Sequence, residues 1–430
     1  MKKLLGLLLV AVVAFPANAA VIKNVELKGE VQTIASTIDN NIGDFFYHGA
    51  KTRAMAGLSV NVWKGIELNT LFQYVYAWGD DNYTNNGFAN ADEMKLANAN
   101  IAFTNLFDSL DVTIGRQFYG DEDSPVIYFG PNHYNVENSL YANALDAVRA
   151  DFHSDSLNVT LLAGKIADIL SGYTREFIGM MLAHRLETRA IIWGGDVKWQ
   201  VSDSLKAQVY GYDLSNLTVR NYTTGYDNPL SFFPNMDGIE HVGVYGAKLS
   251  WSTDTLRMSA EYARNMYGSR ALKERKDTPY MVKADIAQDI GAVTARGTFL
   301  YGKEKWGETG YRSVPFLQMG NYRPGLFIGS LARNIRNNIF SYTNGIRMFN
   351  VGMDYRPADR WKISLDGFSF QDRYGRHSGT LEADLTAIYD YNDYVQLFAG
   401  TGYAKFGKGW KGWKGYTDAT KVQLGTIVHF

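Results

Sequence analysis

The chain contains no cysteine, so no disulfide bond supports its fold, although an oxidising compartment would be tolerated. Its formal net charge is −1, which gives no basis for a nucleic-acid partner or a charged tail. The 7 histidines show no ligand spacing, so neither a metal site nor another cofactor is expected. After the N-terminal segment there is no run of about 18 apolar residues, which by length excludes a transmembrane helix.

Aromatic residues and glycine are abundant, whereas proline is scarce. The sequence has 28 Tyr, 23 Phe and 9 Trp beside 42 Gly, but only 9 Pro. Rings and glycines together are typical of short alternating strands with aromatic girdles and open loops. The composition therefore favours an all-β protein.

The N-terminus has the pattern of a secretory signal peptide. Lys2 and Lys3 precede an apolar run from Leu4 to Val13, and Ala17-Asn18-Ala19 forms a small-x-small cleavage site. The apolar run is too short to span a membrane as a helix. We predict a signal peptide over residues 1–19 and a single mature domain over residues 20–430, with a buried N-terminal helix as the alternative.

One unit recurs along the mature chain: an alternating strand, a tight polar turn and a second alternating strand. The turns are rich in residues that stabilise tight turns. They are WKG at 63, NLFDS at 105, HSDS at 153, VSDS at 201, STDT at 252, QDIG at 288, PAD at 357 and YDYND at 389. These eight hairpins give sixteen strands, and VELKGEVQ and the closing TKVQLGTIVHF raise the number to eighteen. Because the number is even, the first and last strands can pair and close the sheet.

The connections between hairpins are long, in contrast to the turns within them. They cover roughly residues 36–52, 79–94, 118–143, 167–189, 213–241, 264–279, 302–344, 370–378 and 406–419. Short periplasmic turns alternating with long extracellular loops are typical of bacterial outer-membrane barrels. We therefore predict a transmembrane antiparallel β-barrel of about eighteen strands, spanning the cell outer membrane many times.

The two faces of each predicted strand differ in polarity. In 205–212, Leu205, Ala207 and Val209 alternate with Lys206 and Gln208. In a closed barrel of this size the apolar face contacts lipid and the polar face lines an aqueous channel. Aromatic residues at the strand ends predict two interfacial girdles, formed by Trp63, Trp199, Trp251, Trp361 and Phe430 on the turn side and by Tyr76, Trp78, Tyr301 and Tyr403 on the loop side.

Strand parity predicts which charges line the pore. The inward basic candidates are Arg149, Lys198, Lys206, Lys248, Arg257, Lys283 and Arg296, most of them on strands eight to thirteen. Inward acids such as Glu382 and Asp384 concentrate on strand sixteen and on strand one. Opposed basic and acidic walls would create a transverse field. The alternative is that many of these charges neutralise neighbours across strands.

Two long connections are unusually apolar for exposed loops. Arg333 and Arg336 lie in the first, 302–344, beside apolar residues at roughly helical spacing, and the second covers 167–189. Their apolar content argues against disorder. We expect at least one of them to fold into the mouth of the barrel, where Arg333 and Arg336 would contribute to the pore.

One segment resembles the family of alginate-export outer-membrane proteins. The matching residues are Gly115-Arg116-Gln117 at a strand end, followed by Asp146, Val148 and Arg149 on a later strand. The resemblance implies an eighteen-stranded channel with an arginine-lined constriction for an anionic polysaccharide, and so adds Arg116 to the pore candidates. The chain departs from the family in its many lumen acids and in its short last turn, YDYND. Parity also sets Arg116 on the face of Val112 and Ile114, so either a bulge turns it inward or it lies above the lipid band.

The sequence as a whole predicts a passive outer-membrane porin for small hydrophilic or anionic solutes, including saccharides. No nucleophile, base and orienting residue form a visible cluster, so we do not expect an enzyme. The alternatives are an outer-membrane barrel enzyme of lipase or protease type, or a structural adhesin. Membrane lipid and lipopolysaccharide are the expected partners, and a monomer is the simplest expectation for the oligomeric state.

Overall fold

The computed structural model describes most of the chain after the predicted signal peptide. The described residues are 24–40, 47–78, 94–121, 124–131, 142, 144–165, 186–188, 191–215, 219–221, 241–268, 280–303, 305–306, 313–314, 346–372, 379–407 and 418–430. The predicted signal peptide, Arg333, Arg336 and most of the two apolar connections lie outside them. The described part contains no helix long and apolar enough to cross a membrane.

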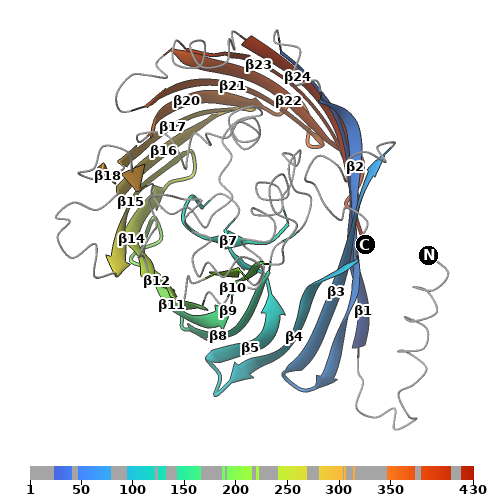
Figure 1. The fold of residues 1–430 in the computed structure, drawn as a ribbon, viewed down its shortest axis with the longest axis vertical. Coiled ribbons are helices and arrows are strands. Elements are labelled where there is room, and N and C mark those ends of the chain that lie inside the picture. Colours follow the sequence, from blue (N-terminus) through green and yellow to red (C-terminus); the bar gives the residue numbers. More distant parts are fainter. Residues whose placement is uncertain are drawn as a thin grey trace.

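Eighteen strands form one antiparallel sheet that closes on itself. They are β1 (Asn24–Asn40), β2 (Tyr47–Trp63), β3 (Ile66–Trp78), β4 (Lys95–Leu106), β5 (Leu110–Gln117), β8 (Leu145–His153), β9 (Leu157–Lys165), β11 (Ile191–Gln200), β12 (Leu205–Ser215), β14 (His241–Ser252), β15 (Leu256–Gly268), β16 (Tyr280–Ile290), β17 (Val293–Lys303), β20 (Ile346–Tyr355), β21 (Trp361–Asp372), β22 (Thr380–Asp390), β23 (Val395–Lys405) and β24 (Asp418–His429). Figure 1 shows them following one another around a ring, from blue β1 to red β24. The predicted fold class and strand number are confirmed.

Three short strand pairs occur within the long connections. They are β6 (Tyr119–Gly120) with β7 (Tyr128–Phe129), β10 (Leu186–Thr188) with β13 (Val219–Asn221), and β18 (Lys305–Trp306) with β19 (Ser313–Val314). In Figure 1, β7 lies inside the ring of wall strands. The connection between β5 and β8 therefore enters the space that the wall encloses.

All eight predicted tight turns connect neighbouring wall strands. The WKG turn joins β2 to β3 through Gly65, whose φ of +76° suits glycine. In the NLFDS turn, three residues that are not glycine have left-handed backbone: Asn105, Phe107 and Asp108 have φ values of 57°, 52° and 64°. The turn sequences thus determine where each hairpin reverses.

The barrel closes where the first and last strands meet. β1 pairs with β24 from Glu30 opposite His429 to Asn40 opposite Ala419. The Gly29 N–H donates to the Phe430 carbonyl at 2.8 Å, and the Phe430 N–H donates to the Gly29 carbonyl at 3.1 Å. A Cβ at position 29 would lie 2.3 Å from the Phe430 ring, so the terminal ring covers this glycine. The predicted closure is confirmed, and it leaves the wall without a free edge.

The outer face is apolar and the inner face is polar. On β20, Phe349 and Val351 are 49% and 73% exposed, whereas Asn350 between them is 6% exposed. On β12, Val209 faces outward while Tyr210 faces inward and is buried. Exposed apolar side chains of this kind occur on strands all around the wall. The arrangement reverses that of a water-soluble sheet and fits a wall with lipid outside.

Candidate pore lining

Seven of the ten basic residues predicted to line the pore share the inner face of the wall. They are Arg149, Lys198, Lys206, Lys248, Arg257, Lys283 and Arg296, each in register with neighbours that alternate with exposed apolar residues. Arg333 and Arg336 lie outside the described residues. Arg116 lies on the outer face.

Arg296 joins charged side chains from three strands on this face. Its Nε and Nη2 donate to Asp354 Oδ1 at 3.1 and 2.9 Å, and Nη2 also donates to Asp366 Oδ2 at 2.7 Å. Asn350 donates to Asp366 Oδ1 at 3.0 Å, and Lys362 Nζ lies 3.4 Å from Asp354 Oδ2. One guanidinium therefore holds two carboxylates from different strands, and Lys362 partly balances the remaining negative charge.

Arg257 and Lys283 form two further ion pairs on neighbouring strands. The Arg257 Nη1 and Nη2 atoms donate to both oxygens of Asp289 at 2.6 and 2.9 Å, the parallel geometry that suits a guanidinium and a carboxylate. Lys283 Nζ lies 3.4 Å from Asp285 Oδ2. Lys283 is buried in the wall, while Arg257 is half exposed at its turn-side end.

Arg149 and Lys198 pair with acids two residues away on their own strands. Arg149 Nε donates to Asp151 Oδ2 at 2.6 Å, and Lys198 Nζ lies 3.4 Å from Asp196 Oδ2. Five of these seven predicted cations are thus in ion pairs with other described residues, whereas Lys206 and Lys248 form none within that part of the chain. The predicted alternative of neutralisation by neighbours therefore describes most of this wall, which weakens any transverse field.

Several inner-face charges were not among the predicted basic pore residues. Arg53 on β2 is fully buried and donates from Nη2 to Glu30 Oε1 at 2.5 Å, and Lys421 on β24 is also fully buried. Both lie at the start of predicted strands, just after the predicted connections 36–52 and 406–419. Two carboxylates of the inner-face ion pairs, Asp289 in the QDIG turn and Asp354 on β20, were also not predicted. The alternation of KTRAM and TKVQL at these strand ends places Arg53 and Lys421 on the inner face.

The connection between β5 and β8 is fastened to the inner wall at two places. Tyr119 Oη donates to Asp196 Oδ1 at 3.3 Å and lies 2.8 Å from Tyr212 Oη, so it is bound to β11 and β12. Burial raises the pKa of Tyr119 above its usual value, which keeps the phenol protonated. Farther along, the Gln73 side chain on β3 donates to and accepts from the Ala142 backbone, both at 2.8 Å.

This anchored connection narrows the enclosed space. Val126, Ile127 and Phe129 between the two anchors are at most 5% exposed. The sequence predicted that a connection would fold inward but named the two apolar connections 167–189 and 302–344, most of which lie outside the described residues. The inward position of the connection between β5 and β8 was therefore not predicted from the sequence.

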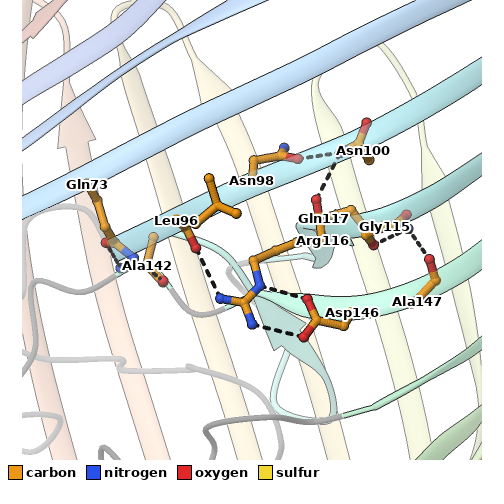
Figure 2. A network of polar contacts seen from close by, with 10 residues as sticks. All are labelled: Gln73, Leu96, Asn98, Asn100, Gly115, Arg116, Gln117, Ala142, Asp146 and Ala147. Atoms are coloured by element: carbon orange, nitrogen blue, oxygen red, sulfur yellow. Dashed lines mark hydrogen bonds and ion pairs between the residues drawn. The ribbon is translucent and has the colours of Figure 1, made fainter. Parts of the chain in front are cut away.

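Arg116 pairs with Asp146 on the outer face, as Figure 2 shows. Its Nε and Nη2 donate to Asp146 Oδ1 and Oδ2 at 2.7 and 2.9 Å, and Nη1 donates to the Leu96 carbonyl at 3.1 Å. The β5–β8 register runs without a shift, so Arg116 stays on the face of the exposed Ile114 and Val148. No bulge therefore turns Arg116 into the pore. Strand parity allowed either an inward turn at a bulge or a position above the lipid band, and Arg116 lies at the loop-side end of the outer face.

The other residues of the alginate-export motif have separate positions. Gln117 is buried on the inner face and donates to the carbonyls of Thr113, Gly115 and Ala147 (Figure 2 shows the last two). Arg149 also faces inward. The motif therefore does not form one arginine-lined constriction. Among the described residues, no group of three His, Cys, Asp or Glu side chains could hold a metal ion.

No protein-family model and no curated protein matches the sequence. Solved structures share its fold at low identity. OccK3 (OpdO) of Pseudomonas aeruginosa is 9% identical, with a TM-score of 0.62 over 96% of this chain and 97% of that one. OccAB1 of Acinetobacter baumannii is 11% identical, with a TM-score of 0.60 over 95% and 98%. The outer membrane protein OprD of Pseudomonas aeruginosa is 9% identical, with a TM-score of 0.58 over 94% of each chain.

These similarities establish the architecture. The three structures cover nearly the whole chain, so the closed barrel is shared from end to end. They carry Occ and OprD names, and no alginate-export protein is among them. The comparisons therefore support the eighteen-stranded barrel that the resemblance implied. They do not support the resemblance to the alginate-export family itself.

Proposed function

We propose that the protein is an outer-membrane channel through which small hydrophilic solutes diffuse passively. The observation that carries the proposal is the closed wall with exposed apolar side chains outside and charged side chains inside. Barrels of 16 to 18 strands are wide enough to leave an aqueous passage. The short turns would face the periplasm and the long connections the exterior. OprD, which shares the fold, is described as an outer membrane protein.

The charges of the inner wall favour the passage of polar solutes, and of anions over cations. Five of the seven predicted basic residues are held in ion pairs, whereas Lys206 and Lys248 have no carboxylate partner within the described residues. These two lysines can bind a passing anionic solute without breaking an existing ion pair. A long polyanion such as alginate would need more such cations, so within this proposal we favour small anionic solutes and saccharides. A channel of this kind needs neither a cofactor nor an energy source.

Planar-bilayer recording tests the proposal. The purified barrel should insert in discrete conductance steps, with current proportional to voltage, moderate anion preference and partial block by saccharides. The control is the same preparation after heat unfolding. A protein that migrates as a folded, heat-modifiable barrel but adds no conductance would contradict the channel, and a structural adhesin or membrane enzyme would then fit better.

A further inference from the structure

Three asparagines lie together on the inner face of β3 and β4. Asn69 lies directly opposite Asn100 in the register, and Leu71 lies directly opposite Asn98. Asn69 and Leu71 share the inward parity of the buried Gln73, and residues opposite each other in an antiparallel pair lie on the same face. All three asparagines are partly exposed, so they are accessible from the enclosed space. We call Asn69, Asn98 and Asn100 the amide strip.

The amide strip has hydrogen-bonding groups that no other described residue uses. Asn69 Nδ2 donates to Asn100 Oδ1 at 3.3 Å. Asn100 Nδ2 donates to Asn98 Oδ1 and, at 3.0 Å, to the Arg116 carbonyl, as Figure 2 shows. A side-chain amide can donate two hydrogen bonds and accept two. Both donors of Asn98, one donor of Asn69 and the oxygen of Asn69 therefore have no partner within the described part of the chain.

Gln117 adds one more acceptor beside the amide strip. It follows Arg116, which lies opposite Ala99, so the register places Gln117 next to Asn98 across β4 and β5. Its Nε2 donates to three backbone carbonyls, whereas its Oε1 is buried and has no hydrogen-bond partner among the described residues. A buried acceptor without a partner is unfavourable, and a hydroxyl donor would satisfy it. This part of the wall therefore offers both donors and acceptors.

The amide strip carries no charge, in contrast to the wall across the ring. On the inner face of β3 to β5, the described charged residues lie near the strand ends, with Lys95 at the loop side and Glu67 and Asp111 at the turn side. Across the ring in Figure 1, β16 and β17 carry Lys283 and Arg296 with their carboxylate partners. The enclosed space thus has a neutral amide side and a charged side.

We propose that the amide strip binds neutral saccharides inside the channel. Sugar hydroxyl groups both donate and accept hydrogen bonds, which matches the donors and acceptors that the strip leaves unused. Small-molecule sites combine an apolar surface with a few placed polar groups, and Leu71 supplies an apolar contact for the C–H face of a sugar ring. An anion gains no charge pairing at the strip and would use Lys206 and Lys248 instead. The proposal rests on the proposed function as a passage for solutes.

Sugar binding by the detergent-purified barrel tests the proposal. The neutral probes are maltotriose, sucrose and lactose, in a detergent without a sugar headgroup, and gluconate is the anionic comparison. We would compare wild type with N69L/N98L, because leucine keeps the size of asparagine but removes its hydrogen-bonding groups. The matched control is N158L, since Asn158 on β9 is also an inner-face asparagine and lies outside the strip. Calorimetric titration should show a loss of about tenfold in affinity for the neutral sugars in N69L/N98L. Gluconate affinity and the N158L variant should be unchanged.

Each other outcome overturns the assignment. If no neutral probe binds folded wild type, or if N69L/N98L binds with wild-type affinity, the strip is not a saccharide site. An equal loss in N158L would show the same, and an equal loss for gluconate would exclude a site for neutral solutes. If N69L/N98L does not fold, N98A is the second variant, and unchanged affinity in it would overturn the proposal.

Failure of this proposal is distinguishable from failure of the channel. Titration does not require conduction, so a barrel that binds sugar but adds no conductance would contradict the channel alone. A conducting barrel that neutral sugars block equally in wild type and in N69L/N98L would contradict the amide strip alone.

Discussion

Arg296 on β17 donates to Asp366 on β21 at 2.7 Å, although the whole of β20 lies between their strands. Gly352 on β20 makes this reach possible. A Cβ there would lie 2.4 Å from Asp366 Oδ1 and 3.0 Å from Arg296 Cζ. The ion pair therefore lies over a glycine and connects three strands on the inner face.

Arg296→Gln should shift the channel toward cations. The change removes the positive charge that balances Asp354 and Asp366, and their carboxylates then attract cations in a narrow, low-dielectric passage. Reversal-potential measurements in a salt gradient would report the shift. Arg347→Gln is the matched control, because it removes an outward arginine and should leave selectivity unchanged. An equal shift in both variants would show that the inner-face assignment of Arg296 is wrong.

Reversing Lys206 and Lys248 to Glu should also favour cations, without breaking an ion pair between described residues. The effect should be large near 0.1 M salt, where the Debye length is about 10 Å, and small near 1 M, where it is about 3 Å. Selectivity measured across this range checks the prediction. A shift that does not depend on salt, or none at low salt, would exclude these lysines as contacts for anions.

Tyr119→Phe should loosen the connection between β5 and β8. The change removes the hydrogen bond to Asp196, and an unsatisfied buried acceptor costs about 1–3 kcal/mol. We expect higher conductance and more current noise, and Gln73→Leu should act in the same direction by removing the second anchor. Tyr76→Phe, on the outer face, serves as the control. Unchanged currents in both anchor variants would mean that this connection does not limit flow.

Phe430→Ala should weaken barrel closure, and deletion of residues 418–430 should abolish it. The ring covers Gly29, and a cross-strand pair of this kind contributes about 0.2–1 kcal/mol. Deleting the strand leaves the edge of β1 unpaired within lipid, which a membrane wall does not tolerate. Heat-modifiable migration in gels and protease resistance would follow assembly. A deletion variant that still migrates as a compact barrel would contradict closure between β1 and β24.

The alternation of residues along the chain determined most of the architecture. A period of two sets the inner and outer faces, and the eight polar turns set the strand number. These signals are local, so they can be read without knowing which strands are neighbours. They placed Val209 outside, Lys206 inside and Phe430 in a strand that meets β1. They also placed Arg116 on the outer face, against the role that the family resemblance implied.

Only the tertiary structure decided which charges meet. Arg296 and Asp366 are 70 residues apart in sequence, and their contact depends on the register of three strands and on Gly352 between them. Register is a non-local property, and a slip by one residue would exchange the faces of a strand. The positions of Tyr119 and Ala142 on the inner side of the wall likewise depend on partners on β3, β11 and β12. For this reason the sequence predicted an inner wall rich in charge, while the fold determined that most of the predicted basic residues on that wall are paired.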